Sequence, residues 1–221
     1  MSLSKSDVVS AGEAGAVIEV LREAVNNSSL VLVQTGAEVN VTRLIEDILQ
    51  VAESEKIDTR LLLGPTDPLD CQLFEKRQIG WLTWEENDPQ QGRPTLTILK
   101  PSDLVGLRLY ISDIISKEHG RLALIGDFLD TVFTSVSSNE TLFILVSQIA
   151  TRMKSHNVAG IFTVSEGLHD EARLALVRRF ADKVVRIKPS SESTKARRSP
   201  RNRPAPESLY QTRSDRSIFL P

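Results

Sequence analysis

The feature of this sequence that most constrains its fold is a short apolar run, Leu122 to Ile125, which ends at Gly126 and Asp127. A run of this length, bounded by a glycine and an acid, is typical of a buried strand in a parallel sheet. Such a strand brings its last residue to the carboxyl edge of the sheet, where α/β proteins bind ligands. Asp127 is therefore the first candidate for a site residue.

Other stretches with the composition of strands alternate with amphipathic segments of helical period. The expected strands are residues 30–33, 57–63, 95–99, 158–164 and 181–187, the expected helices are 13–25, 43–52, 101–117, 141–156 and 169–180, and a weaker helical pattern covers 69–78. This alternation predicts an α/β fold with a mostly parallel sheet flanked by helices on both faces. The strand at 158–164 ends at Ser165, which we expect at the same edge as Asp127.

The chain is long enough for one well-buried domain and a tail. It has 221 residues, 40% hydrophobic and 25% charged, and we expect the domain at 1–188 and the tail at 189–221. A net charge of -2 gives no overall indication of binding to nucleic acid or to a membrane. Cys71 has no second cysteine to pair with, and no apolar run approaches the ~20 residues of a membrane span. We therefore expect a cytoplasmic protein without a membrane partner.

The segment after the first expected strand has the position of a phosphate-binding loop but not its residues. If Thr42 takes the final hydroxyl position of G-x-x-x-x-G-K-[ST], Val41 stands at the lysine, Asn40 at the second glycine and Thr35 at the first. What remains is Gly36, displaced by one residue, Thr42 and a helix N-terminus that still attracts anions. Thr42 is either a magnesium ligand or an ordinary hydroxyl of the first helical turn.

The order of these stretches resembles the RecA superfamily, closest to its archaeal KaiC-like branch, over roughly residues 10 to 189. The similar stretches are LVLVQTG, RLALIGDFLD, VAGIFTVSEG and FADKVVRIKP. The resemblance implies a RecA-like (P-loop NTPase-type) fold. Members that hydrolyse ATP carry a lysine in the loop and acidic residues after the second strand, where this chain has Val41 and Gly64-Pro65-Thr66. Asp67, the first acid there, lies between two prolines, so the resemblance is to a degenerate domain.

Two classes of function follow. The first is a non-catalytic regulatory or scaffold subunit that associates with itself or with an active RecA-like relative. The second is a nucleotide-binding ATPase or sensor with an atypical loop, with ATP and magnesium as its cofactors. Gly36, Thr42, Arg43 and Asp127 would then bind the nucleotide, with Arg43 in place of the lysine and with Thr42 and Asp127 as metal ligands. Because the lysine and the second-strand acid are missing, the sequence favours the first class, and we assign no catalytic residue.

Two tryptophans leave a smaller question open. Trp81 and Trp84 follow the weak helical pattern around a glycine, and they either stack on a base or pack inside the fold.

The segment from 189 to 221 has the composition of a disordered basic tail. Its cations would contact phosphate backbones or an acidic protein in a salt-sensitive way, or belong to a solvated linker. They are Lys195, Arg197, Arg198, Arg201 and Arg203. The apolar end SIFLP is a candidate docking peptide for a protein partner. The basic tail adds a third candidate function, an accessory factor in DNA recombination.

Overall fold

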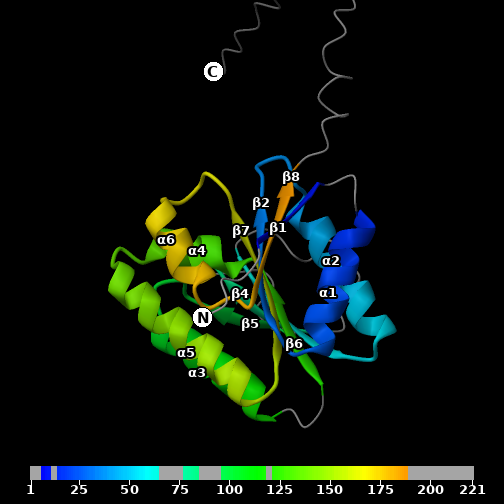
Figure 1. The fold of residues 1–221 in the computed structure, drawn as a ribbon. Helices are drawn as coiled ribbons and strands as arrows, with labels where there is room; N and C mark the ends of the chain where they lie inside the picture. The colour runs from blue at the N-terminus through cyan, green and yellow to red at the C-terminus, as the bar shows by residue number, and fades with distance from the viewer. Residues whose placement is uncertain (1–5, 11–13, 65–76, 85–95, 118–120, 189–221) are drawn as a thin grey trace, which may run out of the picture. The chain divides into compact units, whose positions relative to one another are not determined.

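The computed structural model describes residues 6–10, 14–64, 77–84, 96–117 and 121–188 (Figure 1). The strands are β1 Ser6–Ser10, β2 Leu30–Thr35, β3 Asp58–Leu63, β4 Gln78–Leu82, β5 Leu96–Leu99, β6 Leu122–Gly126, β7 Ala159–Ser165 and β8 Lys183–Lys188. The helices are α1 Ala14–Asn26, α2 Val41–Ser54, α3 Leu104–Lys117, α4 Phe128–Ser135, α5 Asn139–Ser155 and α6 Glu171–Arg178.

The strands form one sheet of eight in the order β1-β8-β2-β7-β6-β3-β4-β5, and every pairing is parallel. The carboxyl ends of all strands therefore lie at one edge. β2 lies between β8 and β7, and β6 lies between β7 and β3. The ends of β2, β3, β6 and β7 are thus brought together, although they are far apart in the sequence.

Two layers of helices cover the sheet. Figure 1 shows α1 and α2 on one side and α3, α4, α5 and α6 on the other. Successive strand residues alternate between the layers: Val31 packs towards α1 and α2, and Leu32 packs towards the other four helices. All five residues of β6 are buried, as expected for a strand covered on both faces. The expected α/β fold, with a parallel sheet between two helix layers, is confirmed.

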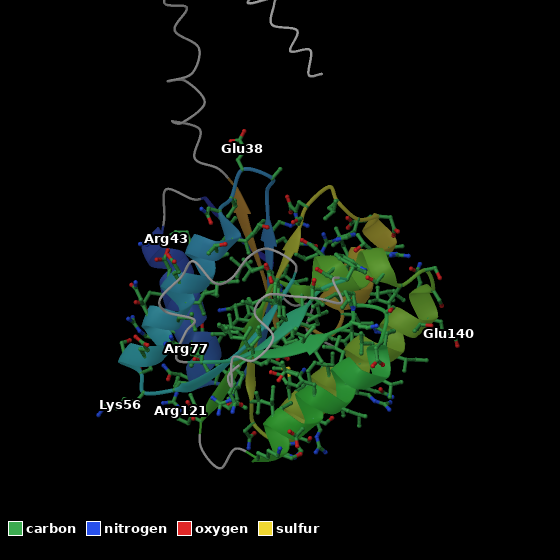
Figure 2. The ribbon with its side chains drawn as sticks, turned by 180° about the vertical axis from the view of Figure 1, so that it is seen from behind. Glu38, Arg43, Lys56, Arg77, Arg121 and Glu140 are labelled. Atoms are coloured by element: carbon green, nitrogen blue, oxygen red, sulfur yellow. The ribbon has the colours of Figure 1, made fainter. Side chains whose placement is uncertain are left out.

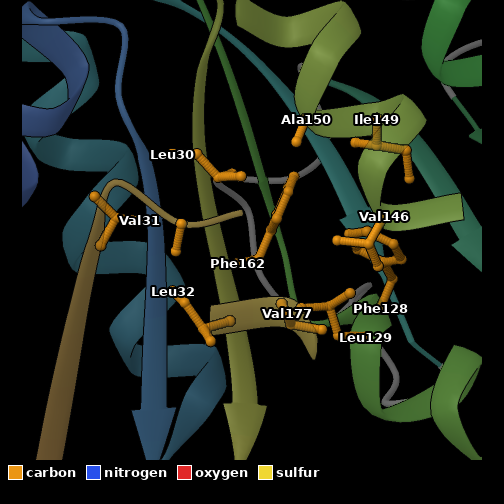
Figure 3. A pocket seen from close by; sticks show the side chains of 11 residues that line it. Leu30, Val31, Leu32, Phe128, Leu129, Val146, Ile149, Ala150, Phe162 and Val177 are labelled. Carbon is orange, nitrogen blue, oxygen red and sulfur yellow. The ribbon is translucent and has the colours of Figure 1, made fainter. Parts of the chain in front are cut away.

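The larger core contains an aromatic contact and a small void. The rings of Phe128 and Phe162 meet edge to face, with centroids 5.1 Å apart and an angle of 87°. Beside them an apolar void of about 20 Å³ lies between β2, β7 and the helices α4, α5 and α6 (Figure 3). Its walls offer water no hydrogen-bond partner, so we expect it to stay empty.

Three elements differ from the sequence-based expectation. β1 and β4 were not predicted, and Gln78, expected at the end of a weak helix, begins β4. Residues 69–76 of that expected helix lie outside the described residues. The segment 128–133 was interpreted as a continued apolar run, but it forms α4, since its apolar residues recur at helical spacing.

The two tryptophans have different environments. Trp81 is 6% exposed and belongs to the core on the α1 and α2 side, whereas Trp84 is 56% exposed. The packing alternative therefore holds for Trp81. In the described part of the chain, no helix has the length and apolar composition to cross a bilayer.

Candidate functional site

Two backbone hydrogen bonds hold the start of the loop from β2 to α2. The Gly36 amide donates to the carbonyl oxygen of Ile187 at 3.2 Å, and the Gly36 carbonyl accepts from the amide of Val39 at 3.0 Å. Phosphate-binding nests alternate right- and left-handed backbone conformations. Among the described glycines, the positive φ belongs to Gly167, not to Gly36. The loop therefore lacks the backbone shape of a phosphate cradle.

The N-terminus of α2 is occupied by a side chain of the protein. Asn40 is the N-cap, and its Oδ1 accepts a hydrogen bond from the backbone amide of Arg43 at 3.0 Å. A free amide at this position would otherwise be available to an anion. Asn40 thus stabilises the helix with the same kind of contact that a phosphate oxygen would make.

Arg43 pairs with acids of its own helix. Its Nη1 lies 3.3 Å from Glu46 Oε2 and its Nε lies 3.3 Å from Asp47 Oδ1, with 65% of the side chain exposed. Figure 2 shows Arg43 on the outer side of α2 and Glu38 at the tip of the preceding loop. Arg43, the proposed substitute for the lysine, therefore lies along the helix. The side chain at the tip of the loop is an acid, Glu38.

Asp127 ties the ends of two neighbouring strands together. Its Oδ1 accepts from the amide of Gly64, directly after β3, at 2.7 Å, and its own amide donates to Leu62 O at 3.1 Å. Close approach of the strands requires Gly126, because a Cβ there would lie 1.9 Å from Leu62 O. Burial raises the pKa of Asp127 from 3.8 to about 6; the hydrogen bond from Gly64 opposes this rise, and the charge of Asp130 adds to it.

Asp130, one turn further along α4, links that helix to the end of β7. Its carboxylate accepts from the Ser165 amide at 3.1 Å, from Ser165 Oγ at 2.7 Å and contacts His169 Nε2 at 2.8 Å. The His169 ring also packs against Phe133, with centroids 4.8 Å apart. The serine hydroxyl points to the aspartate and not to the histidine, so this is not the arrangement that activates a serine nucleophile.

An open cavity of about 310 Å³ lies beside Asp127 and Asp130, at the carboxyl edge of β3, β6 and β7. It is lined by Val41, Gly64, Trp84, Asp127, Asp130, Thr131, Thr134, Thr163, Ser165 and Leu168. The volume is at the lower end of the roughly 300–1,000 Å³ of small-molecule sites. Two carboxylates and several hydroxyls line it, while exposed Trp84 and Leu168 supply an apolar wall.

The structure does not bring all the predicted site residues to this cavity. Asp127 lines it, whereas Gly36, Thr42 and Arg43 are not among its lining residues. No lysine or arginine of the described chain lines it either, so none of the described lining side chains offsets the charge of a triphosphate. No group of three or more metal-ligating His, Cys, Asp or Glu occurs within the described ranges. The predicted tail cations, from Lys195 to Arg203, lie outside those ranges.

Sequence reasoning missed most residues of the site, among them Asp130, Thr131 and His169. The sequence did contain a signal for Asp130 and Thr131. Once 128–135 is recognised as a helix, both residues share one face with Asp127. His169 carried no signal, since its partner Asp130 is 39 positions away in the sequence.

The protein is thus an α/β protein with a parallel sheet between two layers of helices, and comparison with known proteins adds likenesses of fold. No protein-family model matches the chain, and no curated protein matches its sequence. A KaiC-like protein from the hyperthermophilic archaeon Pyrococcus horikoshii is similar in structure, with a TM-score of 0.47 and 11% identity, over 72% of this chain and 71% of that one.

Two further solved structures are similar at the same level. The flagellar accessory protein FlaH from Methanocaldococcus jannaschii has a TM-score of 0.46 and 11% identity, covering 76% of each chain. PCH-2 from C. elegans has a TM-score of 0.47 and 15% identity, over 80% of this chain and 43% of that one. TM-scores below 0.5 give no guide to activity, so the fold class follows from the sheet order and helix layers, and the KaiC-like branch stays a prediction.

Proposed function

We propose that this protein is a RecA-like subunit that does not hydrolyse ATP and acts as a regulatory or scaffold protein, through self-association or pairing with an active RecA-like relative. The observation that carries the proposal is the start of α2. Asn40 Oδ1 takes the amide of Arg43 at 3.0 Å, and Val41 follows where a phosphate-binding loop has its lysine. A bound phosphate would need both the amide and the missing positive charge.

The charges around this edge of the sheet support the same proposal. Asp127 and Asp130 line the cavity without a basic side chain among the described lining residues, and Glu38 is exposed on the adjoining loop. Like charges in a partly desolvated cleft repel one another. A triphosphate would meet this repulsion, and phosphoryl transfer depends on charge stabilisation that these residues do not provide.

The proposal is tested by calorimetric titration of the full chain with ATP and magnesium, together with a phosphate-release assay and light scattering for the oligomeric state. We expect no heat of binding at millimolar ATP and no phosphate release, with either a homo-oligomer or a complex with a RecA-like relative. Asp127→Ala and Arg43→Ala serve as matched variants. ATP binding by the native chain that either substitution abolishes would overturn the proposal.

One observation favours a second candidate, a nucleotide sensor with an atypical loop. The exposed Trp84 borders the cavity that Asp127 and Val41 line, and its indole offers a face on which a base could stack. A nucleotide that binds there would quench Trp84 fluorescence, and Trp84→Leu would remove the quenching.

The third candidate, a recombination accessory factor, depends on the tail and stays a prediction. DNA binding that weakens with salt and disappears when residues 189–221 are deleted would favour it. The cytoplasmic location likewise stays a prediction.

A further inference from the structure

A second cavity lies between α3 and α5, in the helix layer away from α1 and α2. It is an open groove of about 400 Å³. Two arginines, Arg108 from α3 and Arg152 from α5, line it together with four hydroxyl side chains and a glutamine. No carboxylate is among these described lining residues. The groove is therefore lined by basic side chains, whereas the cavity at the carboxyl edge of the sheet is lined by acidic ones.

Neither arginine has an acidic partner in the described part of the chain. Arg108 Nη1 donates to Gln148 Oε1 at 2.9 Å, and Arg152 Nη2 donates to Ser116 Oγ at 2.6 Å. Arg152 Nε is buried and makes no hydrogen bond to any described residue. The nearby Asp113 is paired with Lys117, with 2.7 Å between Oδ2 and Nζ. Among the described residues, these two guanidinium charges thus have no counterion.

The two arginines enter the groove from different helices, Arg108 from α3 and Arg152 from α5. Gln148, the partner of Arg108, and Arg152 lie one turn apart along α5, about 6 Å at 1.5 Å per residue. The hydroxyls of Ser112 and Thr151, also in the groove, make no hydrogen bond to a described residue. Guanidinium groups and hydroxyls that converge from two sides are suited to the several oxygens of a phosphate.

We propose that the groove between α3 and α5 binds the phosphate groups of a phosphorylated small molecule. A phosphate carries more charge and more acceptor oxygens than a carboxylate, and several phosphate oxygens offer acceptors to both arginines that line the groove. The volume of about 400 Å³ lies within the range of small-molecule sites. Two arginines are few for a nucleic acid, whose binding proteins typically make about 6–10 phosphate contacts.

The test is calorimetric titration of the full chain with inorganic pyrophosphate, with inorganic phosphate and with a short single-stranded oligonucleotide. We expect pyrophosphate to bind more tightly than phosphate, since it reaches both arginines. Arg108→Gln and Arg152→Gln should each weaken pyrophosphate binding about tenfold or more, as expected for loss of a charge-assisted hydrogen bond. Arg121→Gln is the matched control, because Arg121 bonds to Asn26 at the end of α1 instead.

A fourth variant keeps the test valid if either arginine is needed for folding. Thr151→Glu retains both guanidinium groups and adds a carboxylate at an exposed position in the groove. We expect it to abolish pyrophosphate binding while thermal unfolding stays cooperative. Absence of heat with both phosphates, or binding that all three groove variants leave unchanged, would overturn the proposal. Tighter, strongly salt-dependent binding of the oligonucleotide through the same arginines would overturn the small-molecule assignment.

Discussion

At the scale of single residues, Asp127 should make stability depend on pH. Its folded pKa of about 6 lies above the ordinary 3.8 because of burial, so the folded state holds the proton more tightly than the unfolded state. The stabilisation from protonation is complete below about pH 3.8 and is lost as the pH rises through about 6. Ionisation of Asp127 then lowers the free energy of unfolding by at most about 3 kcal/mol.

Asp127→Asn removes this ionisation and keeps an oxygen for the Gly64 amide. We expect the variant to be more stable than the native chain at pH 8, with the difference shrinking towards pH 4.5. Urea unfolding at both pH values measures it. Asp113→Asn, at an exposed helix position, controls for the loss of one negative charge. A stability difference that is the same at both pH values would contradict the assigned cause.

At the scale of secondary-structure elements, the N-cap of α2 stabilises the helix that follows the loop. Asn40→Ala removes the acceptor for the Arg43 amide and should lower the free energy of unfolding by about 1 kcal/mol, whereas Asn40→Gly should cost only a few tenths. Urea unfolding measures both. The matched comparison is Asp170→Ala at the N-cap of α6. There Asp170 Oδ1 accepts from the Arg173 amide at 2.9 Å. Equal losses for alanine and glycine at position 40 would show that the cap is not the cause.

At the scale of the whole molecule, one sheet joins two cores, so damage to either core should destabilise both. Phe128 in the larger core and Ile48 in the α1 and α2 core are both 0% exposed. Phe128→Ala should cost about 3–5 kcal/mol and Ile48→Ala about 2–5 kcal/mol, each in a single unfolding transition. Circular dichroism and tryptophan fluorescence should report the same midpoint. Two separate midpoints in either variant would mean that the layers unfold independently.

The sequence predicted the alternation of strands and helices because each layer leaves a periodic apolar pattern, clearest in the fully buried β6. It missed β4 because the apolar residues of this stretch are interrupted by Gly80. The structure gives a reason for this glycine: a Cβ there would lie 2.5 Å from the ring of Tyr110. Asp127 was found because strand ends meet at one edge. Asp130 was missed because 128–133 was not recognised as a helix, and His169 was missed because periodicity within a segment carries no information about contacts between segments.

The position of β2 also bears on how this chain is made. β2 pairs with β7 and β8, and the Leu30 amide bonds to Asp182 Oδ2, 152 positions later in the sequence. A ribosome adding about 5–20 residues per second reaches that partner roughly 8–30 s after making Leu30. For most of that interval this hydrophobic strand has neither of its neighbours, since β7 begins at Ala159 and β8 at Lys183. While this chain is being synthesised, α1 and α2 are therefore the elements available to cover β2, which later becomes an interior strand of the sheet.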